Sequence, residues 1–236
     1  MLKPQTNTNN QESSLPLEGF YISLTALIDN NIEQFPPFLG EATRESKSIG
    51  EIKKDKFEQE DDITLRFGRF FRYLGSEFDF ESQSKTPEAN ATTDIGIIVP
   101  RFCKHRVICF VEAKRLPTPK DTKREETEYV YYKSTSKQGG IERFKTEKHA
   151  GQEKLNFSIM LGYIQEQTHS YWHTEVNKWI ESQINTSSNS EINWANQDKL
   201  IHDTTFTKAN ITKYNSTHSR KNLKDIEMLH YWIDVN

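Results

Sequence analysis

The 236-residue chain lacks the features that mark secreted, membrane-spanning and nucleotide-binding proteins. It has only two cysteines, Cys103 and Cys109, too few for a disulfide framework, and no further ligands that would make them a metal site. No apolar run reaches the ~18–20 residues that a membrane-spanning helix needs, and no hydrophobic signal segment opens the sequence. Neither common type of glycine-rich phosphate-binding loop is present. We therefore expect a cytoplasmic protein with no membrane contact.

The chain also lacks an overall positive charge, since its net charge is −3. Its basic residues are nevertheless concentrated in two segments. Residues 101–148 contain thirteen Lys and Arg against seven Asp and Glu, and residues 208–224 contain five basic residues and no acid. Such segments contact phosphates or are ordinary solvated loops, and the counts alone leave both readings open. The candidates for nucleic-acid contact are Lys137, Gly139, Gly140, Arg143, His218 and Arg220.

Internal repeats and long low-complexity linkers are missing as well, which favours one domain. We expect a disordered tail over residues 1–16 and a single domain over residues 17–236. Helical spacing of apolar residues predicts helices over 20–32, ending before Pro36-Pro37, and over 63–74, ending at Gly75, with a polar stretch between them.

Strands and further helices follow along the chain. A short strand is expected over 78–81, and strands 92–99 and 107–114 should form an antiparallel hairpin. A charged loop (117–128), a helix (141–149), a strand (157–164), a helix (172–183), a loop (185–196) and a closing strand (227–235) complete the order. This order predicts an α/β fold with a mixed central sheet flanked by helices. Trp172, Trp179 and Trp232 are expected in the core rather than as base-stacking platforms.

Charged residues end the apolar strand that contains Phe110-Val111-Glu112-Ala113-Lys114. Because side chains alternate along a strand, Glu112 and Lys114 should emerge on the same face. Asp94 opens the preceding strand, and the start of one arm of a hairpin lies beside the end of the other. We therefore expect Asp94, Glu112 and Lys114 to meet at one edge of the sheet. Helical phase also turns Glu60 toward the interior, although a first-turn acid that serves the helix dipole is the alternative.

This combination of side chains suits metal-assisted phosphodiester hydrolysis. Two carboxylates that share a site repel each other, and a divalent cation relieves the repulsion. Hard oxygen ligands favour Mg²⁺ or Mn²⁺. A lysine beside the cation can orient or deprotonate a water molecule and can stabilise charge on a phosphate. The alternative is a structural salt bridge between Lys114 and its acids.

Thr93-Asp94, seventeen intervening residues and Glu112-Ala113-Lys114 resemble the core motif of the PD-(D/E)XK nuclease superfamily, which has the restriction-endonuclease-like fold. The resemblance covers about residues 58–165, with Thr93 in place of the usual proline. It implies that Asp94, Glu112 and the backbone carbonyl of Ala113 bind the metal and that Lys114 acts on the water. The acid that many members carry on the preceding helix maps onto Glu60.

The resemblance implies a Mg²⁺-dependent nuclease, with DNA as the favoured substrate, in a bacterial restriction, defence or repair setting. A homodimer or a larger defence complex is compatible with it. One alternative is a nuclease fold without catalysis that binds nucleic acid, and another is an interaction subunit of a defence complex. His169 and His173 have the spacing of a helical zinc pair but lack a third ligand, which favours surface histidines.

Overall fold

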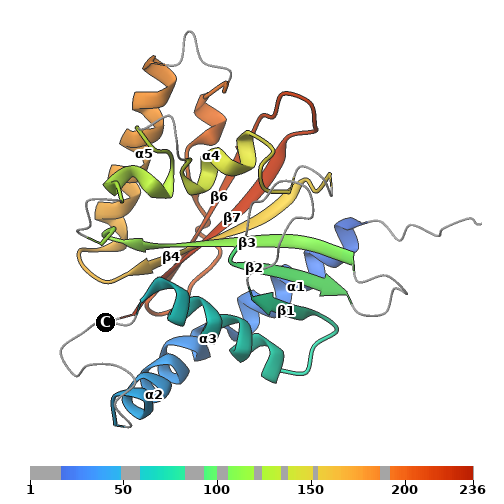
Figure 1. The fold of residues 1–236 in the computed structure, drawn as a ribbon, viewed down its shortest axis with the longest axis vertical. Coiled ribbons are helices and arrows are strands. Elements are labelled where there is room, and N and C mark those ends of the chain that lie inside the picture. The colour runs from blue at the N-terminus through green and yellow to red at the C-terminus, as the bar shows by residue number, and fades with distance from the viewer. Residues whose placement is uncertain are drawn as a thin grey trace, which may run out of the picture.

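The computed structural model of the protein describes residues 17–48, 59–82, 93–99, 106–119, 124–133, 138–150, 154–186 and 192–235. These residues form an α/β structure, an open mixed sheet of seven strands with helices on both faces (Figure 1). The predicted tail over residues 1–16 lies outside the described residues. No described helix is long and apolar enough to cross a membrane.

The strands are β1 (Asp79–Ser82), β2 (Ile95–Val99), β3 (Arg106–Leu116), β4 (Phe157–Ile164), β5 (Ile201–His202), β6 (Ile211–His218) and β7 (Ile226–Asp234). Their order across the sheet is β1-β2-β3-β4-β7-β6-β5. The central strands β3, β4 and β7 run parallel, whereas the pairs toward both edges are antiparallel. Every residue of β4 is buried, as expected for a strand covered on both faces.

Two layers of helices cover the sheet (Figure 1). One layer contains α1 (Leu17–Asn31), α2 (Phe35–Ser48) and α3 (Glu60–Tyr73), and the other contains α4 (Gly140–Lys145) and α5 (His169–Thr186). Short 3₁₀ helices are η1 (Ile32–Gln34), η2 (Glu126–Tyr129) and η3 (Asn196–Asp198). Each layer packs on its own hydrophobic cluster, so the sheet separates two cores.

The alternation of side chains along β3 decides where its charges lie. Val111 and Ala113 belong to the core beneath α1, α2 and α3, whereas Phe110 and Leu116 belong to the core beneath α4 and α5. Glu112 and Lys114 have the phase of Phe110 and Leu116, so they lie on the α4 face. The prediction that the two charges share a face is confirmed.

Most predicted elements are present. The structure confirms the helix that ends before Gly75, where φ is +65°, the antiparallel pairing of β2 with β3, and the buried strand β4. Trp172 and Trp232 are 2 % and 0 % exposed, as expected for core residues, and Trp179 packs partly buried beside them.

Two expectations about the elements are wrong. Pro36 and Pro37 do not begin a polar stretch but lie in the first turn of α2. Proline is tolerated there because the first backbone N–H groups of a helix have no partner within it. No strand was predicted between residues 196 and 227, but residues 211–218 form β6, which pairs with β7 along its whole length.

Candidate active site

Asp94 and Glu112 approach each other through the β2–β3 pairing. Ile95 pairs with Val111, so one further step along the antiparallel register places Asp94 opposite Glu112 on the α4 face of the sheet. Asp94 Oδ2 accepts a hydrogen bond from the backbone N–H of Ala113 at 2.7 Å. This bond fixes the first acid against the strand that carries the second.

Glu112 is 1 % exposed and is surrounded by cationic groups. Its Oε1 accepts hydrogen bonds from Lys114 Nζ and Arg143 Nη1, each at 2.7 Å. His149 Nε2 lies 3.4 Å from its Oε2. Burial alone would raise the pKa of Glu112, but Lys114, His149 and Arg143 together hold that pKa well below its usual range. Glu112 is therefore a permanent anion at neutral pH.

Lys114 is the central cation of the site. Its Nζ donates to Glu112 Oε1 and to the carbonyl oxygen of Ala113, both at 2.7 Å, and lies 3.8 Å from Glu60 Oε1. Burial would lower the pKa of Lys114, but the neighbouring carboxylates, Glu112 first, hold it above its usual range. In this state Lys114 is a proton donor and a positive charge rather than a base.

Asp94 differs from Glu112 in its protonation. Burial and then the negative charge of Glu112 raise the pKa of Asp94 to about 7, although Lys114 acts in the opposite direction. The two acids thus cannot both ionise freely at neutral pH without an added positive charge. Repulsion of this kind is what a divalent cation relieves.

The donor set fits a hard divalent cation. Asp94 and Glu112 supply carboxylate oxygens, and Ala113 supplies the carbonyl oxygen that Lys114 contacts. Glu112 Oε2 is buried and, apart from the contact with His149 Nε2 at 3.4 Å, has no hydrogen-bond partner in the described part of the chain, so it can serve as a ligand. These oxygens suit Mg²⁺ or Mn²⁺ with retained waters. No three His, Cys, Asp or Glu side chains among the described residues form a metal-binding group by themselves.

Glu60 reaches the site from the first turn of α3, where it is 8 % exposed, as its helical phase predicted. Its Oε2 accepts the backbone N–H of Arg115 at 2.8 Å. Both carboxylate oxygens also accept from Arg124 Nη2, at 2.9 and 3.0 Å. Glu60 therefore ties the start of α3 to the end of β3, and its oxygens are already occupied.

Two residues of this site, Arg124 and His149, were missed by the sequence analysis. Arg124 was placed in a charged loop, yet it bonds Glu60 and, through Nε, Glu128 Oε2 at 2.9 Å. The available signal was the separation of Arg124 and Glu128 by four residues, which suits an ion pair on a helical turn. His149 was assigned to a helix without a role. Nothing in its sequence context places it beside Glu112.

Arg143 and the two glycines before it lie around the start of α4. Arg143 contacts Glu112, as described above, whereas Gly139 donates its N–H to Glu142 Oε2 at 3.0 Å. A Cβ on Gly139 would lie 2.4 Å from the backbone N and Cα of Tyr131. Close packing thus explains why a glycine is needed at position 139. A Cβ added to Gly140 would likewise lie 2.6 Å from Met160 Cε. Their contact with phosphate stays a prediction. Lys137 lies outside the described residues.

The hydrogen-bond partners of His218 and Arg220 are residues outside this site. His218 is 0 % exposed; its Nδ1 is 2.6 Å from Asp198 Oδ1 and its Nε2 is 2.7 Å from Ser216 Oγ. Both ring nitrogens are occupied, so neither can reach a phosphate in this structure. Arg220 donates from Nε to the carbonyl oxygen of Lys224 at 2.7 Å and is 8 % exposed.

His169 and His173, the two histidines with the spacing of a helical zinc pair, make separate contacts. His169 Nδ1 lies 2.5 Å from Thr212 Oγ1, and His173 Nε2 lies 2.9 Å from the carbonyl oxygen of Leu200. Each ring therefore has its own partner on a different segment.

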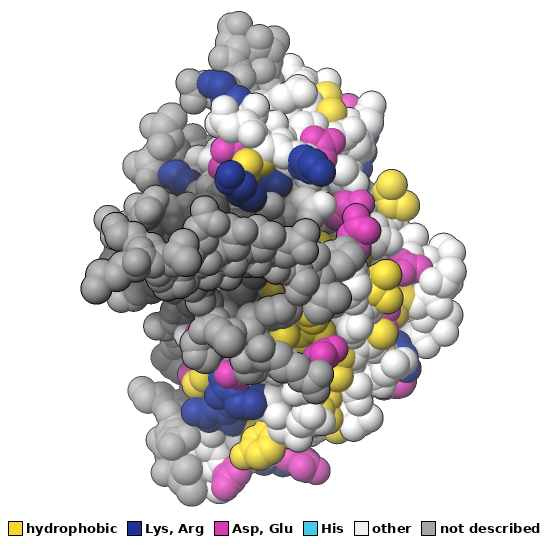
Figure 2. All heavy atoms as spheres, turned by 90° about the vertical axis from the view of Figure 1, so that its right-hand side faces the viewer, with side chains coloured by type: hydrophobic (Ala, Val, Ile, Leu, Met, Phe, Trp, Pro, Cys, Tyr) yellow, Lys and Arg dark blue, Asp and Glu magenta, His cyan; other side chains and the backbone are white. Residues whose placement is uncertain are grey.

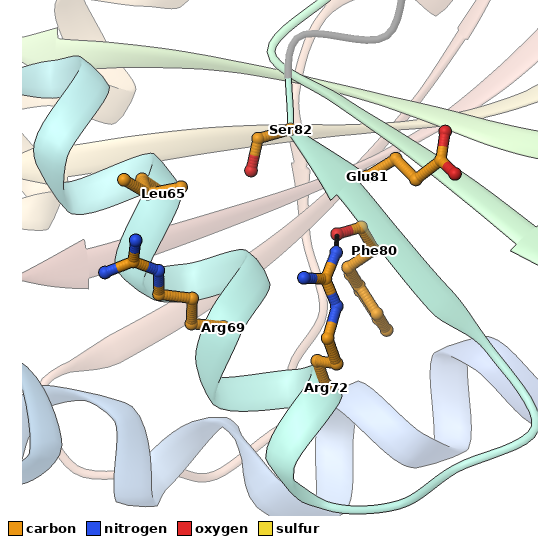
Figure 3. A pocket seen from close by; sticks show the side chains of 6 residues that line it. All are labelled: Leu65, Arg69, Arg72, Phe80, Glu81 and Ser82. Atoms are coloured by element: carbon orange, nitrogen blue, oxygen red, sulfur yellow. Dashed lines mark hydrogen bonds between the residues drawn. The ribbon is translucent and has the colours of Figure 1, made fainter.

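A surface hollow of about 400 Å³ lies between α3 and β1, outside the acidic site (Figure 3). Arg69 and Arg72 project from α3 beside it, and Arg72 is tied to the carbonyl oxygen of Phe80 at 2.5 Å and to Asp79 at 2.9 Å. The face at the right of Figure 1 shows basic and acidic side chains interspersed, with hydrophobic side chains between them (Figure 2). The described residues of that face do not form one continuous basic surface.

Comparisons with protein-family models, with curated proteins and with solved structures find no match to this chain.

Proposed function

We propose that the protein is a metal-dependent nuclease of the PD-(D/E)XK, restriction-endonuclease-like class, which hydrolyses phosphodiester bonds with DNA as the favoured substrate. The observation that carries the proposal is the convergence of Asp94 and Glu112 from adjacent antiparallel strands beside Lys114. The order α3-β1-β2-β3-α4-β4, with β4 parallel to β3, is the order that the resemblance implies, and it supports the proposal. A role in restriction, defence or repair, alone or in a complex, is part of the same proposal by analogy.

In this proposal the chain's own residues position the reaction. Asp94, Glu112 and the Ala113 carbonyl would hold Mg²⁺ or Mn²⁺, which would supply Lewis-acid polarisation of a phosphate oxygen and activation of water. Lys114, protonated and held by Glu112 and Glu60, stabilises negative charge on the attacked phosphate. Glu60 orients this end of β3 through the Arg115 N–H and Arg124. The residue that accepts the proton of the attacking water is not Lys114 in its charged state.

The test is Mg²⁺-dependent nicking of supercoiled plasmid DNA by Glu112→Gln. We expect a rate loss of at least about 100-fold, because loss of a direct metal ligand should cost no less than loss of the residues that support one. Glu81→Gln is the matched control, because Glu81 is an exposed acid on β1. Circular dichroism and thermal unfolding should show that both variants fold. Cleavage by Glu112→Gln at the wild-type rate would remove the proposal.

A second candidate is a nucleic-acid-binding module that has the nuclease fold without catalysis. The observation in its favour is that Lys114 and Arg143 both donate hydrogen bonds to Glu112 Oε1, so two protein cations offset its charge. Binding of DNA that persists in EDTA, with no product at any Mg²⁺ or Mn²⁺ concentration, would support this module. Absence of affinity for DNA and RNA at low salt would instead support an interaction subunit.

A further inference from the structure

Arg143 is in an unusual position for a nucleic-acid contact, because its guanidinium is bonded to a candidate metal ligand. Nη1 donates to Glu112 Oε1 at 2.7 Å, and Nε donates to the carbonyl oxygen of Gln138 at 3.1 Å. The Arg143 side chain is 33 % exposed, compared with 1 % for the Glu112 side chain. One edge of the Arg143 guanidinium therefore contacts Glu112, while the rest of the side chain is partly exposed at the surface.

The two cations on Glu112 are not equivalent. Lys114 is buried, and its Nζ is held by Glu112, by the Ala113 carbonyl and, at 3.8 Å, by Glu60. Arg143 comes from α4 on a long side chain, and its one bond to β3 is the bond to Glu112 Oε1. Of the two, Arg143 can leave with less disturbance of the strand, because it loses a single contact there.

A divalent cation at Glu112 would compete with Arg143. Like charges at such short range repel strongly when water is largely excluded. If Arg143 moves away from Glu112, its planar guanidinium becomes free to bind another group near the site. A guanidinium binds phosphate through two parallel hydrogen bonds. The Arg143 side chain can thus pair with Glu112 when the cation is absent and bind a phosphate of the substrate when the cation is present.

We propose that Arg143 is a placeholder for the divalent cation: it pairs with Glu112 in the metal-free protein and moves to a phosphate of the bound nucleic acid when the cation enters. This inference rests on the proposed function, since it gives Arg143 the role of coupling metal binding to substrate binding. A fixed basic contact with nucleic acid would affect only DNA binding. The placeholder role instead predicts that one substitution of Arg143 strengthens metal binding and weakens DNA binding.

The experiment measures Mn²⁺ affinity by isothermal titration calorimetry, and affinity for a short labelled DNA duplex in Ca²⁺ by fluorescence anisotropy. Arg143→Ala should bind Mn²⁺ about 3- to 10-fold more tightly, because a competing cation is gone. It should bind DNA about 5- to 10-fold more weakly, because a phosphate contact is gone. Arg143→Lys should restore much of the wild-type behaviour in both measurements.

Arg69→Ala is the matched control for charge. Arg69 is an exposed arginine on α3, nine residues or about 14 Å along the helix from Glu60, and it lines the hollow shown in Figure 3. The Arg69→Ala substitution removes one positive charge, as Arg143→Ala does, but leaves the contacts of Glu112 unchanged. The Mn²⁺ affinity should therefore change less than twofold. An unchanged or weakened Mn²⁺ affinity in Arg143→Ala would overturn the placeholder role, because a purely structural role for Arg143 predicts weaker binding.

These outcomes are separable from those of the nuclease proposal. If the wild-type protein cleaves plasmid DNA but Arg143→Ala shows no gain in Mn²⁺ affinity, the nuclease proposal stands and the placeholder role of Arg143 is wrong. A wild-type protein that never cleaves, with Arg143→Ala showing tighter Mn²⁺ and weaker DNA binding, would support the placeholder within an inactive binding module.

Discussion

Lys114 Nζ lies 2.7 Å from Glu112 Oε1, and the two side chains come from the same face of one strand with a single residue between them. Both are almost fully buried, at 7 % and 1 % exposure. Burying two charges is costly, and their mutual attraction compensates only when the geometry is good and other hydrogen bonds are made. The Ala113 carbonyl and Arg143 supply those additional bonds.

Loss of Lys114 alone should therefore cost more stability than loss of both charges. In Lys114→Met the anionic Glu112 keeps Arg143 but loses the buried ammonium group of Lys114, and we expect a decrease of about 2–4 kcal/mol in the free energy of unfolding. The double variant Lys114→Met with Glu112→Gln removes the stranded charge and should recover at least about 1 kcal/mol of that loss. Urea unfolding of the four proteins measures the coupling. Strictly additive effects of the two substitutions would show that the pair is not coupled.

Asp94 should destabilise the fold when it ionises. Its pKa is raised to about 7, above the value near 3.9 of an unfolded aspartate, so the folded state binds the proton more tightly. The contribution of Asp94 to the stability of the wild type should then fall from about pH 4 to pH 7 and remain lower above that range, which the difference between Asp94→Asn and the wild type isolates. Asp94→Asn keeps a carbonyl acceptor for the Ala113 N–H and has no such penalty. We expect it to be more stable than the wild type by on the order of 2 kcal/mol at pH 8.

The same comparison at pH 4 should show little difference between Asp94→Asn and the wild type, because Asp94 is protonated in the fold there. Thermal unfolding at pH 4 and pH 8 is sufficient for this test. Mn²⁺ at pH 8 should stabilise the wild type and leave Asp94→Asn nearly unchanged, since the cation requires the ionised acid. Equal unfolding temperatures of the two proteins at pH 8 would contradict the proposed repulsion.

Gly139 provides a test of packing at the start of α4. An alanine there would place Cβ 2.4 Å from backbone atoms of Tyr131, which cannot move aside as a flexible side chain would. Gly139→Ala should lower the free energy of unfolding by about 2 kcal/mol or more. Gly40, an exposed glycine in α2, has nothing within 4 Å of the same added atom. Gly40→Ala should stabilise the protein by about 0.5–1 kcal/mol, because alanine is the better helix former.

The sequence was sufficient to predict the acidic site because its geometry is local. Alternation along one strand places Glu112 beside Lys114, and a hairpin brings Asp94 to them. Helical phase then turns Glu60 inward. Each of these inferences depends on a repeat of two or about 3.6 residues and on one short connection.

The remaining parts of the site depend on contacts between distant segments. Arg124 reaches Glu60 across 64 positions of sequence, and Arg143 reaches Glu112 across 31. No periodicity predicts such contacts. Strand β6 was missed for a different reason, because His218 and Ser216 look like loop residues until their buried partners are known. A polar strand can be buried when another segment satisfies its hydrogen bonds.

Those buried partners form a chain of hydrogen bonds that should make the fold sensitive to acid. Along it, Asp198 contacts His218 at 2.6 Å, and Ser216 contacts both His218 and His230 at 2.7 Å. Burial lowers the pKa of His218, against the pull of Asp198, and lowers the pKa of His230 much further, with His218 as the second cause. The fold therefore holds both rings neutral, while the unfolded chain takes up protons near pH 6.5.

The contribution of these two histidines to the free energy of unfolding should consequently fall as the pH drops below about 6.5, by up to about 1.4 kcal/mol per pH unit for each of them, opposite in sign to the contribution of Asp94. His230→Gln replaces the imidazole by an amide that forms hydrogen bonds but cannot titrate. The number of protons taken up on unfolding, which sets this slope, should therefore decrease by about one between pH 6.5 and pH 5. His202→Gln, at an exposed histidine of β5, is the control and should leave the slope as it is. Urea unfolding at several pH values gives the slopes directly. A His230→Gln protein with the full wild-type slope would show that the buried chain does not account for the acid sensitivity.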